Sequence, residues 1–300
     1  MQSRTGSWIP SRLATALLAA SLIGGCADMA PSAPGQAADP RSACAALDRS
    51  LGKSMVGVPL DGVGIDSAQW VDSASPAFCK VRGHIAQAEG GATPTAFEVN
   101  LPTDWNGAAV QFGDGIEGRR APVDPAAALT AGYATYGQGG GAAGNVSPAA
   151  QVAAQKRLRD VAAELLVRRH GRFPDRFYLI APTGGGLTAL AAAERFPRLF
   201  KGVLADAGGP AAAGGEPATN PLLEFSSSGG KLFILAPDGD SSAATPMLQW
   251  YRALVERIGQ RSADDFVRVY RLPAAESAPG IERLTALVDW AEHGKSPPAR

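Results

Sequence analysis

The hydrophobic positions from residue 108 onward follow two alternating patterns. Short, nearly continuous apolar runs predict buried strands, because a strand covered on both faces has no polar side. These runs are Ala108–Phe112, Tyr133–Tyr136, Phe177–Ala181, Gly202–Ala207 and Lys231–Ala236, and Phe266–Leu272 is predicted to be the last strand. Segments with apolar residues three or four positions apart predict helices at Pro125–Thr130, Ala149–Arg169, Pro246–Ile258 and Ile281–Trp290. Strands and helices that alternate with short links predict an α/β protein with a doubly wound, mostly parallel sheet.

The region before residue 108 has the period of half-buried strands. Phe78–Ala86 and Ala96–Leu101 alternate apolar and polar residues, and a loop with glycine and proline separates them. This pattern predicts an antiparallel pair of strands at the edge of the sheet. His84 lies on the first strand, and we interpret it as a surface or edge histidine rather than a catalytic one.

The first 43 residues have the pattern of an export signal and a linker. Basic residues precede the apolar run Leu13–Ile23, which at about 11 residues is too short for a transmembrane helix. Ile23, two glycines and Cys26 look like a bacterial lipobox, so residues 1–25 are predicted to be a lipoprotein signal peptide. Cys26 would then be lipidated and anchor the chain in the cell envelope, at the outer membrane. An ordinary secretory signal with a chance cysteine is the alternative. Residues 26–43 are interpreted as a flexible tether and residues 44–300 as one domain.

Composition narrows the class of protein. The chain has 300 residues, 45% of them hydrophobic, and a formal net charge of +0, which suits one domain with a sizeable core. Neutral charge argues against nucleic acid as a main partner, because phosphate binding needs a basic face. In an oxidising compartment, Cys44 and Cys79 are predicted to form a disulfide; two buried free thiols are the alternative.

The carboxyl ends of the predicted parallel strands should converge on one pocket, where ligands of such sheets bind. These ends are Gly113–Gly115, Gly137–Gly141, Pro182–Gly184, Asp238–Asp240 and Pro273–Ser277. Backbone amides of Gly113, Asp114 and Gly115 can supply half of an oxyanion hole, or the segment is a plain turn. No metal or cofactor is expected.

The stretch Asp175–Pro197 joins a strand, a glycine turn and a small-residue helix. A sharp strand-to-helix turn is the nucleophile elbow of α/β hydrolases. The central position, where serine is expected, holds Pro182, which has no nucleophilic atom. Shifting the motif by one residue makes Thr183 the substitute, with Gly184 and Gly185 beside it.

Short sequence motifs that follow one another in a fixed order, from Cys44 to about Pro298, resemble those of a known family. They are Cys44–Leu47, Pro76–Val81, Phe97–Pro102, Trp105–Gly107, Ala193–Pro197, Phe200–Val203 and Leu287–Ala291. Through them the chain resembles the tannase/feruloyl esterase family, which includes secreted α/β hydrolases that act on esters of aromatic acids. The resemblance implies an α/β-hydrolase fold. It also implies that the family's large lid and calcium site are missing here, because the segment that matches the lid is too short.

The resemblance also places the family's catalytic triad on this chain. The family motif Gly-Cys-Ser-Thr-Gly-Gly-Arg matches Ile180–Gly186, so Pro182 stands at the serine position. The family's acid matches Asp240. We interpret Asp240 as a vestige of the triad, and an ordinary loop residue is the alternative. The family's histidine matches Ser277. The nucleophile and the base are therefore both expected to be absent.

These residues favour a non-catalytic protein. His84, His170 and His293 are all predicted to lie away from the strand ends, and His170 is interpreted as a cation at a helix C-terminus followed by Gly171. We expect an accessory envelope lipoprotein that binds a small aromatic or ester ligand. The alternatives are a carboxylic-ester hydrolase that uses Thr183 or an Asp114–Asp240 pair, and a purely structural lipoprotein.

Overall fold

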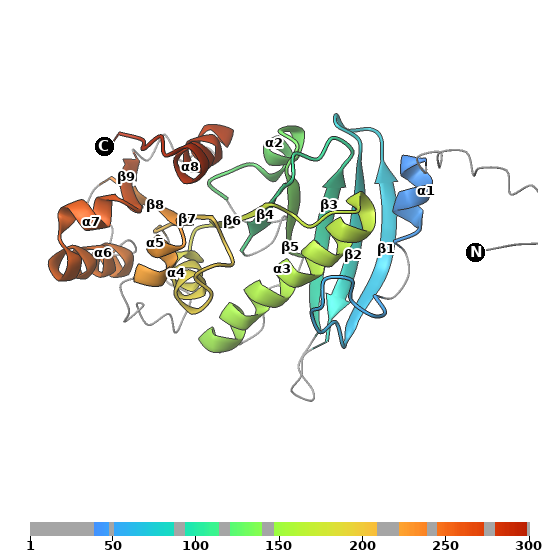
Figure 1. Ribbon diagram of the computed structural model, residues 1–300, viewed down its shortest axis with the longest axis horizontal. Coiled ribbons are helices and arrows are strands. Elements are labelled where there is room, and N and C mark those ends of the chain that lie inside the picture. Colours follow the sequence, from blue (N-terminus) through green and yellow to red (C-terminus); the bar gives the residue numbers. More distant parts are fainter. Residues whose placement is uncertain are drawn as a thin grey trace, which may run out of the picture. The chain divides into compact units, whose positions relative to one another are not determined.

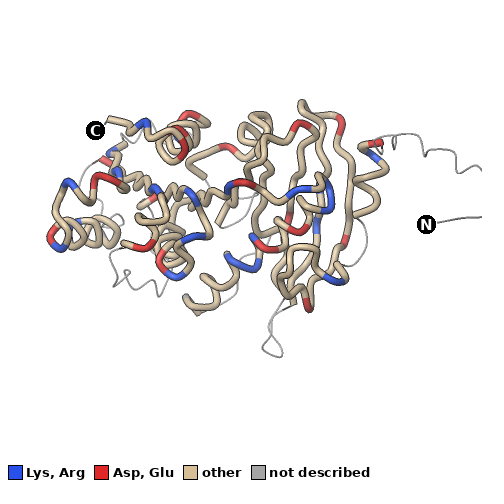
Figure 2. Tube along the Cα trace, in the orientation of Figure 1, with Lys and Arg blue, Asp and Glu red and all other residues tan. Residues whose placement is uncertain are grey.

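The computed structural model describes residues 39–47, 51–86, 94–113, 121–139, 147–208, 222–238, 245–272 and 280–298 (Figure 1). In these ranges, no helix is both long enough and apolar enough to cross a membrane. Charges of both signs are interspersed along the described trace (Figure 2). This distribution agrees with the equal numbers in the sequence, 28 basic and 28 acidic residues.

One sheet of nine described strands forms the centre of the fold, in the order β1-β2-β3-β5-β4-β6-β7-β8-β9. The strands are β1 Val63–Val71, β2 Phe78–Ile85, β3 Thr95–Pro102, β4 Ala108–Phe112, β5 Ala134–Gln138, β6 Arg176–Ala181, β7 Gly202–Asp206, β8 Lys231–Pro237 and β9 Val267–Leu272. From β5 to β9 every pairing is parallel, whereas β1, β2, β3 and β5 pair antiparallel. The predicted mostly parallel sheet with antiparallel edge strands is confirmed.

Helices cover both faces of this sheet (Figure 1). They are α1 Pro40–Ala45, α2 Pro125–Thr130, α3 Pro148–His170, α4 Gly186–Arg195, α5 Leu223–Ser227, α6 Thr245–Ile258, α7 Gln260–Asp264 and α8 Ile281–His293. Phe177 and Leu179 of β6 belong to the core cluster with α3, α4 and α6, whereas Tyr178 and Ile180 belong to the cluster with α2 and α8. Since both faces are buried, the strand is apolar from Phe177 to Ala181, and this apolar run is what predicted it from the sequence.

The sheet begins one strand earlier than the sequence predicted. β1 pairs with β2 over its whole length, from Val63 opposite Ile85 to Val71 opposite Phe78. A register shift between Ile65 and Ser67 interrupts its alternation of apolar and polar residues, and this bulge hid the strand. β2 and β3 form the predicted antiparallel pair.

The two described cysteines form the predicted disulfide between α1 and β2. Cys44 and Cys79 are bonded across a sequence separation of 35 residues, and both are fully buried. α1 begins at Pro40, inside the segment interpreted as a tether, and Asp39 caps it by accepting a hydrogen bond from Ser42 N at 3.1 Å.

His170 ends α3 but is not the predicted cation. Its ring stacks on Trp105 with centroids 4.7 Å apart. Burial, helped by the nearby charges of Arg169 and Arg172, lowers the pKa of His170 to about 4. The imidazole is therefore neutral at pH 7, and the capping-cation interpretation is wrong. Gly171 ends the helix as predicted, with a left-handed φ of 72°.

Replacing His170 with glutamine should flatten the pH dependence of stability below pH 6.5. Between the ordinary pKa of 6.5 and the lowered value of about 4, the unfolded chain binds more protons than the native chain. Native stability contributed by neutral His170 is therefore lost as pH falls through this window. After discounting for partial exposure, we expect a loss on the order of 1–2 kcal/mol in the wild type. Urea unfolding between pH 4 and 7 measures it, with exposed His293→Gln as the control; parallel profiles for wild type and His170→Gln would contradict it.

Candidate functional site

The turn between β6 and α4 has the predicted strand–turn–helix form. Gly185 N donates to Pro182 O at 2.8 Å, and Gly184 is left-handed with φ 89°, as in a type II β-turn. The left-handed residue thus lies two positions after Pro182, whose ring restricts its own φ to about −65°. A Cβ on Gly186, the first residue of α4, would lie 2.7 Å from the carbonyl oxygen of Asp206, so α4 starts in close contact with β7.

The hydroxyl of Thr183 is held by an aspartate that sequence reasoning missed. Thr183 Oγ1 donates to Asp206 Oδ2 at 2.8 Å, and Gly208 N donates to Asp206 Oδ1 at 2.7 Å. Gly184 N donates to Gly208 O at 2.9 Å, which ties the two loops together. Asp206 ends β7, and β7 runs parallel to β6 with Ala205 opposite Ala181. An acidic residue at the end of a buried strand was the signal that could have found it.

The amide of Gly113 is engaged in the sheet. Gly113 N donates to Ile180 O at 2.9 Å, so this amide is not available to an oxyanion. The carbonyl of Gly113 accepts from Gln155 Nε2 at 3.1 Å, and Gln111 Nε2 in turn donates to Gln155 O at 3.2 Å. This buried chain of side-chain amides joins β4 to α3. Asp114 and Gly115 lie outside the described residues.

A small cavity lies behind the elbow. Its lining includes Gly113, Gln155, Ala181, Gly185 and Thr188, and its volume is about 10 Å³, enough for one water molecule. This cavity can solvate the buried amides but cannot hold an organic ligand.

All three histidines of the chain lie in the described part, and none is at the elbow. His84 is on β2, with Nδ1 2.8 Å from Asp66 Oδ1 at the surface. His170 precedes the amino end of β6, whereas the elbow follows its carboxyl end. His293 ends α8. The region around Thr183 and Asp206 therefore contains a hydroxyl and a carboxylate but no imidazole.

Several predicted site residues lie outside the described ranges, namely Asp240, Ser277 and the lipidation candidate Cys26. Among the described residues, no group of three His, Cys, Asp or Glu side chains is arranged to hold a metal ion. Between β7 and β8 the described part contains α5, and residues 209–221 lie outside it.

Comparison with solved structures defines the class of fold. The chain superposes on feruloyl esterase B from Aspergillus oryzae with a TM-score of 0.65 and 13% identity, over 86% of this chain and 91% of that one. It superposes on the tannin acyl hydrolase from Aspergillus niger with a TM-score of 0.60 and 12% identity, over 86% and 87%. At such low identity these likenesses concern the fold alone, and they confirm the predicted α/β-hydrolase fold.

Sequence comparison then relates the chain to a family. Residues 79–213 match the family model described as tannase and feruloyl esterase. The chain is also 30% identical over 202 residues to an uncharacterized esterase, Atu5261, of Agrobacterium fabrum (strain C58 / ATCC 33970). That alignment covers 58% of this chain and 36% of the relative, so the chain spans about a third of the length of the curated relative. The resemblance to the tannase and feruloyl esterase family predicted from the sequence is therefore confirmed, with the family match over residues 79–213.

Proposed function

We propose that this protein is a non-catalytic, ligand-binding or accessory member of its hydrolase family. The observation that carries the proposal is the chemistry of the β6–α4 turn: Pro182 has no nucleophilic atom, and the chain's three histidines are elsewhere. Acyl transfer by a triad needs a nucleophile and a base that removes its proton. The proposed ligand is a small aromatic or ester compound bound at the carboxyl ends of the strands, and lipidated Cys26 holds the protein in the bacterial envelope.

The Thr183–Asp206 contact supports this proposal, because the pair lacks an effective base. A general base must accept the proton of the threonine hydroxyl, and histidine is the side chain that most often does so. The three histidines of the chain lie on β2, at the end of α3 and at the end of α8, away from this pair. In our interpretation Asp206 instead holds the two loops together through Thr183 and Gly208.

The alternative function is a carboxylic-ester hydrolase that uses Thr183. Two observations favour this alternative. The hydroxyl of Thr183 donates a hydrogen bond to Asp206 at 2.8 Å. The chain is also similar to the tannase and feruloyl esterase family and to an uncharacterized esterase. In this alternative Asp206 orients the threonine hydroxyl toward the substrate and accepts its proton.

A single experiment distinguishes the two functions. The purified full chain is titrated with ethyl benzoate, methyl cinnamate and phenyl acetate, and both heat of binding and released acid are followed. We expect saturable binding of at least one ester, which is recovered intact. Turnover by the wild type that falls about 100-fold or more in Thr183→Ala would overturn the proposal in favour of the esterase. The control variant is Thr188→Ala. The hydroxyl of Thr188 on α4 donates to Gln151 and not to Asp206, so its loss should leave any turnover unchanged. If the chain shows no binding of any ester and no turnover, the proposal that it binds such a ligand is overturned.

A further inference from the structure

A cavity of about 310 Å³ lies at the β9 end of the sheet, between this strand and the helices α6 and α7. Among the described strands, β9 is the last of the sheet and pairs with β8. The volume is at the lower end of the range for small-molecule sites. None of its lining residues belongs to the elbow, so a ligand in this cavity would bind independently of the proposed function.

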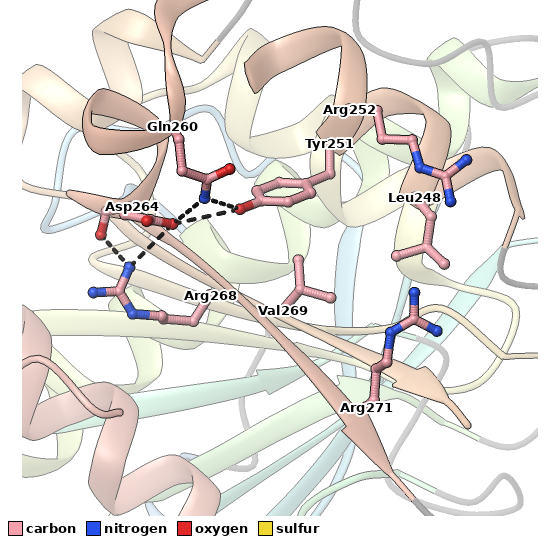
Figure 3. Close-up of a pocket in the computed structure, with 8 residues that line it drawn as sticks. All are labelled: Leu248, Tyr251, Arg252, Gln260, Asp264, Arg268, Val269 and Arg271. Carbon is pink, nitrogen blue, oxygen red and sulfur yellow. Dashed lines mark hydrogen bonds and ion pairs between the residues drawn. The ribbon is translucent and has the colours of Figure 1, made fainter. Parts of the chain in front are cut away.

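One half of this cavity is a closed polar network (Figure 3). Gln260 Nε2 donates to Tyr251 Oη at 2.9 Å and to Asp264 Oδ1 at 2.8 Å. Arg268 Nη1 lies 3.6 Å from the same carboxylate oxygen and also donates to the Asp264 backbone carbonyl. The single negative charge on the wall is therefore already compensated, and these side chains form a fixed boundary.

The other half of the cavity wall carries two positive charges. Arg252 of α6 and Arg271 of β9 both line the cavity, and neither makes a hydrogen bond or ion pair with another side chain in the part of the chain that the structure describes. Figure 3 shows them on the same side of the cavity, reaching from opposite elements with Leu248 between them. Leu248 and Val269 supply apolar surface beside the two guanidinium groups.

We propose that this cavity binds a small organic carboxylate with a compact apolar body. The planar guanidinium group matches the carboxylate geometry and forms paired hydrogen bonds with it. Two cations in a concave site attract an anion more strongly than the same groups on a flat surface. The apolar body of the ligand lies on Leu248 and Val269, and the network around Asp264 limits its size.

Isothermal titration calorimetry of the full chain tests this site with three probes. Cyclohexanecarboxylate should bind saturably, with a Kd of about 0.1 to 1 mM for a ligand of this size. Cyclohexylmethanol has the same ring without the charge and should show no saturable binding. Inorganic phosphate has the charge without the ring and should bind at least fivefold more weakly. Raising the salt concentration should weaken the binding of cyclohexanecarboxylate, because both arginines are solvent-exposed.

Substitutions assign the binding to this cavity. The double substitution Arg252→Gln/Arg271→Gln should raise the Kd for cyclohexanecarboxylate at least tenfold. The matched control Arg195→Gln/Arg261→Gln removes the same charge from exposed positions outside the cavity lining and should leave the Kd within twofold. Absence of saturable binding, or equal affinity in both double variants, would overturn the site. Phosphate that binds more tightly than the carboxylate would overturn the choice of ligand class.

Discussion

Replacing Glu164 with leucine is expected to lower the free energy of unfolding by about 3 to 5 kcal/mol. The Glu164 side chain on α3 has no exposed area, yet it carries a carboxylate. Its oxygens accept hydrogen bonds from Met55 N and Ser54 Oγ at 2.9 Å, and from Val56 N at 3.1 Å. Arg168 Nε donates to it at 2.7 Å. Leucine would leave two amides and a partly buried guanidinium group without their acceptor, at a cost that a hydrophobic replacement does not recover.

The pH dependence of this loss has a definite sign. Burial alone raises the pKa of Glu164, but hydrogen bonds from Met55, Arg168, Ser54 and Val56 outweigh it and lower the pKa below its usual 4.5. Stability from a lowered carboxyl pKa is present above the ordinary value and is lost as pH falls. The difference in the free energy of unfolding between wild type and Glu164→Leu should therefore be largest at pH 7 and should shrink below about pH 4.5.

Urea unfolding at several pH values measures both effects. Glu256→Leu is the control, because Glu256 is exposed on α6 and its replacement should change stability by less than about 0.5 kcal/mol. A loss below 1 kcal/mol for Glu164→Leu at pH 7 would mean that the segment 54–56 is held by other contacts.

Removing the disulfide is expected to cost about 3 to 4 kcal/mol. The Cys44–Cys79 bond closes a loop with a sequence separation of 35 residues, and the chain-entropy model assigns this amount to a loop of that length. The bond also connects α1 to β2, which pairs with both β1 and β3. Loss of the bond increases the freedom of the unfolded chain between α1 and β2.

The measurement compares urea unfolding of the oxidised wild type with that of Cys44→Ala/Cys79→Ala. A second arm unfolds the wild type with a thiol reductant present, because both sulfurs are buried in the native state and reduction requires opening. Both arms should give a similar midpoint. A change below 1 kcal/mol in both arms would contradict the expectation, whereas a loss in the variant alone would indicate a packing defect at the alanines.

Local pattern predicted most of the sheet. The central strands from β4 to β8 are mostly apolar because helices cover both faces, and this burial leaves a clear signal in the sequence. β1 was missed because its bulge between Ile65 and Ser67 breaks the period of two. Short helices such as α5 and α7 have only five residues each, too few for a helical period to be recognised.

The sequence alone predicted the alternation of strands and helices, the turn that carries Pro182, the disulfide between Cys44 and Cys79 and the family resemblance. These features depend on residue type and on spacing along the chain, which a sequence displays directly. Only the tertiary structure decided the neutral state of His170 beside Trp105 and the contact of Thr183 with Asp206. It also decided the buried role of Glu164 and the cavity between Arg252 and Arg271. Each of these depends on packing between separate elements, which sets the burial, charge and hydrogen-bond partners of a side chain.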